Sequence, residues 1–270
     1  MLPACLLEGK KGLIMGVANE RSIAWVVAEA ARRHGAELAF TYQNEALSRR
    51  VWPLAEEAGS RLVFPCDVVN ECEIEALFDH LSDSWGGIDF VVHAIAYADR
   101  NELKGRYVDT SRRNLTTSMM VSCYSFTSVA RRAAALANEG ASLLTFTFSG
   151  ARRVVPSYNV MGVSKAALEA SVKYLAMDLG SVGVRVNAIS SGPMRTLSGA
   201  AIGAGRSIYR WARSNSALGR DLKSENVADA SLYLLSDLSR GVTGEIHYVD
   251  NGNSIVGISS REHPEEGITS

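Results

Sequence analysis

The sequence predicts an α/β protein built on a doubly wound, seven-stranded parallel sheet. Short apolar runs alternate with helical segments along the whole chain, and the first run is continuous rather than alternating. Continuous apolar runs are typical of strands that helices cover on both faces. No linker, repeat or low-complexity stretch interrupts the pattern, so we expect residues 1–270 to form a single domain.

Each predicted element has a local signal. The first apolar run, residues 12–17, precedes a helical period over residues 22–34 that Gly35 ends, and this unit recurs along the chain. The remaining strands are expected at residues 37–42, 61–68, 89–96, 142–148, 184–189 and 245–250. The remaining helices are expected at residues 44–58, 71–85, 111–138 and 224–235, with a central helix that opens at Tyr158. Residues 261–270 are polar, and we expect a loose tail.

Composition excludes several classes of function. Hydrophobic residues make up 47% of the chain, charged residues 21%, and the net charge is −1, which predicts a soluble protein without a basic surface for nucleic acid or membrane. No apolar run reaches the roughly 18 residues of a membrane span. The 4 cysteines are scattered without metal-ligand spacing, so we expect reduced, mostly buried thiols in a cytoplasmic protein and no metal site.

The stretch from Tyr158 to Lys165 is the strongest candidate for a catalytic pair. Its length is about two helical turns, so both side chains would project from one face of the central helix. A neighbouring ammonium favours the phenolate, and a phenol can donate a hydrogen bond to an oxygen that gains negative charge. Taken alone, such a pair is more often a half-buried tyrosine and a solvated lysine, and the rest of the chain changes that balance.

The loop between the first strand and helix could hold a dinucleotide, because ligands of such sheets bind at the carboxyl ends of the strands. A pyrophosphate would rest at the helix N-terminus after Gly16. The G-x-G-x-x-G fingerprint is absent, however, and the alternative is a plain turn with Ser22 as the N-cap.

Other strand ends carry polar or small residues that suit the same ligand. Gln43 can bind a ribose hydroxyl but cannot neutralise a 2′-phosphate, which favours NADH, while Arg49 and Arg50 leave NADPH open. Asp67 could accept a hydrogen bond from the adenine amino group. His93 lies inside an apolar strand, and we interpret it as a core histidine with satisfied hydrogen bonds rather than a base.

Six motifs together resemble the bacterial enoyl-acyl-carrier-protein reductases, the divergent branch of the short-chain dehydrogenase/reductase superfamily. They are Gly16-x5-Ser-Ile-Ala24, Phe40-Thr-Tyr-Gln43, Cys66-Asp-Val68, Tyr158-Asn-Val-Met-Gly-x-x-Lys165, Val184-Arg-Val-Asn-Ala-Ile-Ser190 and Gly192-Pro-x-Arg-Thr196. An ordinary superfamily member would have Tyr-x3-Lys and a glycine-rich first loop, and both are missing here.

The resemblance implies a Rossmann-like fold, usually a homotetramer, that reduces the trans-2 double bond of an enoyl thioester on acyl carrier protein with NADH during fatty-acid elongation. By the family's pattern, Tyr158 hydrogen-bonds the thioester oxygen and Lys165 holds the nicotinamide ribose. The family's cofactor positions fall on Gly16, Ser22, Ile23, Gln43, Asp67, Val68, Ile95, Lys165, Met194, Arg195, Thr196, Leu197 and Ser198. Ala98 falls on a substrate-contact position, and residues 197–211 match the mobile substrate-binding segment.

The chain departs from the family around the expected site. Phe148 stands where a second active-site tyrosine is usual, so the ring remains without its hydroxyl. Ala96 replaces a usual glycine beside the nicotinamide, Tyr97 replaces a usual phenylalanine, and residues 216–220 depart from a Pro-Leu-Arg-Arg pattern. Two alternatives therefore stay open. One is a carbonyl-reducing relative, which the Tyr-x6-Lys spacing disfavours. The other is a catalytically weak NADH-binding paralogue, which the retained tyrosine and lysine disfavour.

Overall fold

A seven-stranded parallel sheet organises the residues that the computed structural model describes, 5–194 and 205–257. The strand order is β3-β2-β1-β4-β5-β6-β7, and all neighbouring strands run parallel. The strands are β1 (Lys11–Met15), β2 (Glu37–Tyr42), β3 (Leu62–Pro65), β4 (Ile88–His93), β5 (Ala137–Phe148), β6 (Arg185–Ser191) and β7 (Ile246–Val249). The predicted doubly wound sheet is confirmed, and its order reverses between β1 and β4, where such sheets bind ligands.

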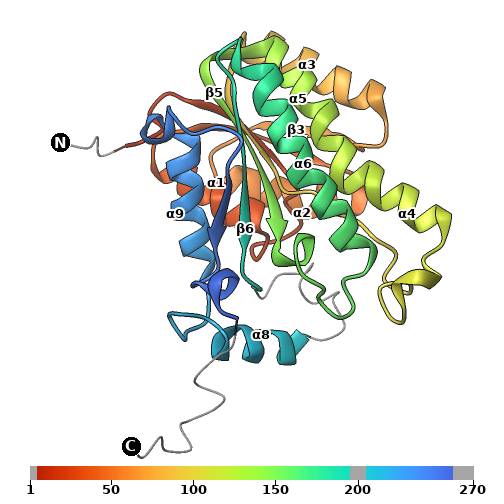
Figure 1. The fold of residues 1–270 in the computed structure, drawn as a ribbon. Helices are drawn as coiled ribbons and strands as arrows, with labels where there is room; N and C mark the ends of the chain where they lie inside the picture. The colour runs from red at the N-terminus through yellow and green to blue at the C-terminus, as the bar shows by residue number, and fades with distance from the viewer. Residues whose placement is uncertain (1–4, 195–204, 258–270) are drawn as a thin grey trace, which may run out of the picture.

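Helices cover both faces of the sheet (Figure 1). One layer contains α1 (Ile23–Arg33), α2 (Glu45–Glu57) and α9 (Ser224–Leu235), and the other contains α3 (Glu71–Trp85), α5 (Ser125–Leu136) and α6 (Val160–Gly180). In β1, Ile14 packs in the first layer while Leu13 and Met15 pack in the second, because successive strand residues point to opposite faces. Burial on both faces explains why the strand has no polar side chain from Gly12 to Met15.

The long helix expected over residues 111–138 is broken into three parts. These are α4 (Arg112–Met119), a π-helical turn (Met120–Tyr124) and α5, and β5 begins at Ala137 rather than at residue 142. Within the π-helical turn, the Ser122 hydroxyl accepts a hydrogen bond from the Tyr97 amide at 2.9 Å and donates to the Tyr97 carbonyl oxygen at 3.1 Å. Single π turns inside α-helices are frequent at functional sites, and this one fixes the segment that follows β4.

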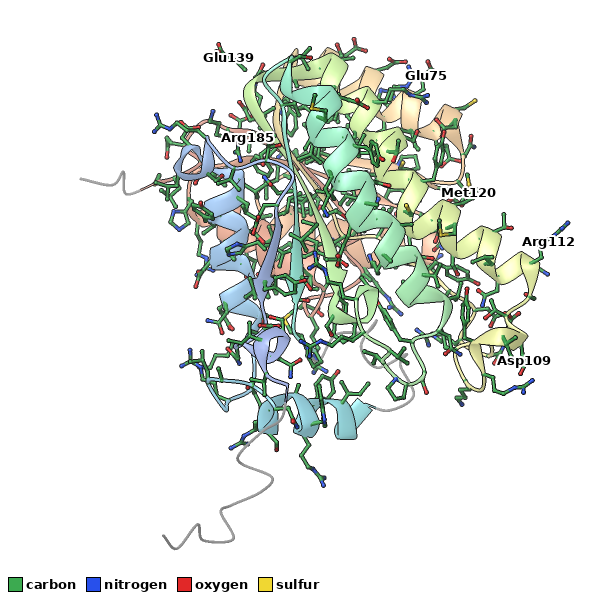
Figure 2. The ribbon with its side chains drawn as sticks, viewed as in Figure 1. Glu75, Asp109, Arg112, Met120, Glu139 and Arg185 are labelled. Atoms are coloured by element: carbon green, nitrogen blue, oxygen red, sulfur yellow. The ribbon has the colours of Figure 1, made fainter. Side chains whose placement is uncertain are left out.

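The two edges of the sheet differ in what surrounds them. Helix α8 (Gly205–Ser214) lies beside the carboxyl ends of the strands, at the bottom of Figure 1. Glu139 and Arg185, near the starts of β5 and β6, mark the opposite edge in Figure 2. We therefore expect a ligand site at the carboxyl ends of the strands, next to α8.

Two further predictions concern exposure. Cys66 and Cys123 are buried and Cys5 is partly buried, but Cys72 is exposed on α3, so the expectation of mostly buried thiols holds only in part. None of the helices in the described ranges is both long enough and apolar enough to cross a membrane.

Candidate active site

A cavity of about 750 Å³ opens at the carboxyl edge, where the chain leaves β1, β4, β5 and β6. This volume is in the range of small-molecule and cofactor sites. Nine of the residues predicted from the sequence line it, namely Gly16, Ser22, Ile23, Ile95, Ala98, Phe148, Tyr158, Lys165 and Met194. Residues distant in sequence are thus brought together by the sheet order.

The loop after β1 brings the backbone close to the end of β4. Gly16 has a φ of +101°, and a Cβ here would collide with the carbonyl group of Ala94. Ser22 stands at the N-cap of α1, but its hydroxyl makes no capping bond and instead accepts hydrogen bonds from the amides of Ala18 and Asn19, both at 3.0 Å. The expected N-cap position of Ser22 is therefore confirmed, but its hydroxyl binds amides of the preceding loop instead of the first turn of the helix.

Gln43 and Asp67 lie farther along the same edge, at the ends of β2 and β3, and do not line the cavity. Gln43 Nε2 donates a hydrogen bond to Asp67 Oδ2 at 3.3 Å. Arg49 forms a 3.3 Å ion pair with Glu45, in which both side chains are about three-quarters exposed. The Val68 side chain is buried in the core on the α3 side of the sheet.

Tyr158 lies in a turn before α6 rather than on the helix, which corrects the prediction that the helix opens there. Its carbonyl oxygen accepts a hydrogen bond from the Met161 amide at 2.9 Å, and its ring packs edge-on against Phe148 with centroids 5.2 Å apart. The side chain is buried, and desolvation raises the pKa of its phenol above the ordinary value of 10.0. Burial thus opposes the phenolate, contrary to the expectation that a neighbouring ammonium would favour it.

Lys165 is on the first turns of α6 and is buried, with 6% of its surface exposed. Its ammonium Nζ donates a hydrogen bond to the Phe146 carbonyl oxygen at 2.8 Å. Desolvation is the main cause that lowers the pKa of Lys165 to about 8. The alternative of a solvated helix lysine is therefore wrong.

His93 is a core residue, as the sequence indicated. Its Nε2 lies 2.9 Å from the Ser125 hydroxyl and its Nδ1 lies 3.3 Å from the Thr145 hydroxyl. Complete burial, followed by the charge of Lys165, lowers the pKa of His93 to about 3, so the imidazole is neutral at physiological pH.

Glu169 is a buried residue near the cavity that the sequence reading missed. Its carboxylate accepts hydrogen bonds from the hydroxyl of Thr147, a cavity residue, at 2.9 Å and from Nε of Arg152 at 3.0 Å. Arg152 in turn lies over the Tyr248 ring, 5.5 Å from its centroid. The available signal was spacing, since Glu169 follows Lys165 by four residues and four-residue neighbours share a helix face.

The segment after β6 is described only in part. Arg195, Thr196, Leu197 and Ser198 lie outside the described residues, as does most of the predicted substrate-binding segment 197–211. Near its end, the hydroxyl of Tyr209 on α8 donates a hydrogen bond to the Met194 carbonyl oxygen at 2.9 Å. No group of three or more potential metal ligands occurs in the part of the chain that the structure describes.

Fold and cavity together define a class, a Rossmann-like α/β protein with a buried tyrosine and lysine at the carboxyl edge of its sheet. The family model described as "Enoyl-(Acyl carrier protein) reductase" matches residues 16–254. The chain is 57% identical over 257 residues to enoyl-[acyl-carrier-protein] reductase [NADH] 2 of Rhizobium meliloti, covering 95% of this chain and 96% of the relative.

Solved structures agree with the family match. The enzyme from Anaplasma phagocytophilum in complex with NAD has a TM-score of 0.90 and 53% identity, over 94% of this chain and 95% of that one. The Bacillus cereus enzyme with NADP+ and indole naphthyridinone has a TM-score of 0.91 and 49% identity, over 94% and 99%. The chain belongs to the enoyl-acyl-carrier-protein reductase family.

Proposed function

We propose that this protein is an NADH-dependent reductase of the trans-2 double bond in enoyl thioesters carried on acyl carrier protein, acting in fatty-acid elongation. The observation that carries the proposal is the burial of Tyr158 and Lys165 in the wall of one cavity. The named relative from Rhizobium meliloti, an NADH enzyme, supports the choice of reaction and reductant.

The residues present fit a dinucleotide. Because Gly16 has no side chain, the first loop can approach the Ala94 carbonyl group closely. Gln43 presents an exposed amide at the end of β2. The exposed Glu45 carboxylate would repel a 2′-phosphate, which supports NADH over NADPH. The proposed cofactor set is Gly16, Ser22, Ile23, Gln43, Asp67, Val68, Ile95, Lys165, Met194, Arg195, Thr196, Leu197 and Ser198.

The chemistry assigned to the chain's own residues is stabilisation of a developing negative charge. NADH, when bound, supplies the hydride for C3 of the enoyl group. As that bond would form, the double-bond electrons would shift toward the thioester oxygen, and C2 would then take a proton from solvent. The phenol of Tyr158 donates a hydrogen bond to the oxygen, and its raised pKa keeps the proton available for donation at neutral pH.

Lys165 and Phe148 support Tyr158 in different ways. With a pKa of about 8, Lys165 is protonated at neutral pH, so it adds positive charge and can hold the nicotinamide ribose hydroxyls. Phe148 has no hydroxyl to offer the substrate, and its role is to pack against the phenol ring at 5.2 Å. Ala98, a short side chain in the cavity wall, leaves room for the acyl chain.

We further propose that the protein is a cytoplasmic homotetramer with no nucleic-acid or membrane partner. Tyr174 and Met177 on α6 are 76% and 82% exposed, and Tyr124 on the π-helical turn is 40% exposed. Tyr174 and Met177 stand three positions apart on α6 and so share one helix face, and apolar exposure gathered in this way is typical of subunit interfaces. The net charge of −1 gives no general attraction for nucleic acid or anionic lipid.

The function is tested by following NADH absorbance with a short trans-2-enoyl thioester and, in parallel, with a 3-ketoacyl thioester. We expect turnover of the enoyl substrate with NADH and slower turnover with NADPH. Preference for the ketoacyl substrate would identify a carbonyl reductase instead. Binding of NADH without turnover of enoyl thioesters of several chain lengths, with either cofactor, would identify a binding protein.

A further inference from the structure

The backbone around Tyr158 is held in a conformation that residues other than glycine seldom adopt. The preceding Ser157 has a φ of +60°, and the following Asn159 has a φ of +38° and a ψ of −119°. Together with the 2.9 Å hydrogen bond from the Met161 amide to the Tyr158 carbonyl oxygen, these angles place Asn159 at the second position of a type II′ turn. That position favours glycine, so the asparagine must be retained for its side chain or tolerated at a cost.

The Asn159 side chain is directed at the segment that follows β4. Its amide Nδ2 lies 3.2 Å from the Leu103 carbonyl oxygen, 3.3 Å from that of Gly105 and 3.5 Å from that of Glu102. Leu103 is itself buried and packs in one apolar cluster with Tyr158. One side-chain amide therefore joins the turn that carries the tyrosine to the loop that covers it.

That loop is anchored firmly at its other side. The Glu102 carboxylate accepts hydrogen bonds from the amide and the hydroxyl of Ser111, both at 2.8 Å, and from Nδ2 of Asn114 at 3.3 Å. Asn114 also accepts a hydrogen bond from the Asp99 amide at 2.9 Å. The carbonyl groups that Asn159 contacts thus belong to a loop tied to the start of α4. Arg112, the first residue of α4, is labelled in Figure 2.

We propose that Asn159 is a positioning residue for the reaction, which acts by holding the Tyr158 turn against the loop of residues 102–105. Its amide compensates for the strained backbone, and the resulting turn aims the phenol into the cavity. The predicted loss of turnover rests on the proposed function. The predicted link between the Tyr158 turn and the loop of residues 102–105 does not, so the function and the link can fail separately.

The test uses Asn159→Gly, which keeps the backbone angles accessible and removes only the side-chain amide. The matched control is Asn251→Gly. Asn251 also has a positive φ, +57°, and also donates from Nδ2 to a backbone carbonyl, that of Arg220 at 2.8 Å. Neither asparagine lines the cavity, but only Asn159 is adjacent to Tyr158. Any general effect of an asparagine-to-glycine change at positive φ therefore appears in both variants.

We expect Asn159→Gly to lower kcat for a short trans-2-enoyl thioester at least tenfold with an unchanged Kd for NADH, and Asn251→Gly to change kcat less than twofold. Because Asn159 acts through Tyr158, the same change made in Tyr158→Phe should lower kcat less than twofold further. An equal loss in both backgrounds, or none in either, would overturn the inference.

Amide hydrogen exchange supplies a readout that does not depend on turnover. Exchange at the hydrogen-bonded amides of Met161, Glu102 and Ser111 should accelerate at least tenfold in Asn159→Gly and remain unchanged in Asn251→Gly. Unchanged exchange in both variants would refute the structural link. Absence of turnover in the wild type would count against the proposed function alone.

Discussion

Replacing Lys165 with methionine should remove a pH dependence of stability that burial imposes on the cofactor-free protein. Desolvation lowers the pKa of Lys165 from 10.5 to about 8, which at about 1.4 kcal/mol per pH unit corresponds to roughly 3 kcal/mol. The folded-state pKa is the lower one, so between pH 8 and 10.5 the unfolded chain binds more protons than the folded chain. The free energy of unfolding therefore rises with pH across this window, by about 2.5 kcal/mol between pH 7 and pH 10.

The assay is urea unfolding of the wild type, Lys165→Met and Lys173→Met between pH 7 and pH 10. Lys173 lies on the same helix but is exposed, so its variant controls for the loss of a lysine from α6. Titration of other groups contributes equally to all three proteins and cancels in the comparison. The wild type and Lys173→Met should gain about 2.5 kcal/mol relative to Lys165→Met over this range. Parallel pH profiles for wild type and Lys165→Met would refute the reasoning.

Three further outcomes follow from the same geometry. The kcat/KM for NADH should fall above pH 8 as Lys165 loses its proton; a flat profile to pH 9.5 would contradict this. Gly16→Ala should weaken NADH binding at least tenfold because the added Cβ meets the Ala94 carbonyl group. The control is Gly59→Ala, at a φ of +75° where a Cβ meets no other atom. It should leave NADH binding intact and lower stability by about 1–2 kcal/mol. Ala96→Gly should bind flat aromatic inhibitors that stack on the nicotinamide roughly 5- to 150-fold more tightly, since a methyl group that overpacks costs about 1–3 kcal/mol. Equal inhibition of the two proteins would exclude that role for Ala96.

Elements bounded by local signals were predictable from the sequence. Strand β2 and helix α3 occupy the expected residues, and α3 has both a side-chain cap at Asn70 and a left-handed Gly86 at its end. The start of α6 was not predictable in the same way. Its displacement to Val160 depends on the positive φ of Asn159, which contacts carbonyl groups more than 50 residues earlier in the chain. Long-range contacts of this kind leave no local pattern.

The site residues likewise divide into features that local sequence patterns predict and features that depend on long-range packing. Motif spacing placed Tyr158, Lys165 and Gly16 around one cavity, because parallel strands end at one edge. The direction of the Tyr158 pKa change was wrong because it depends on how completely neighbours such as Phe148 and Leu103 exclude water. Side-chain burial is a property of tertiary packing, and the spacing of a tyrosine and a lysine does not reveal it.

The most direct test of the central claim is the turnover of a short trans-2-enoyl thioester by Tyr158→Phe, with the Kd for NADH measured alongside. If the phenol stabilises the developing oxyanion, kcat should fall about 100- to 1000-fold while NADH binds as in the wild type. A variant that retains wild-type kcat would contradict the account. The Tyr158 hydroxyl would then contribute nothing to turnover, and the ring would serve packing alone.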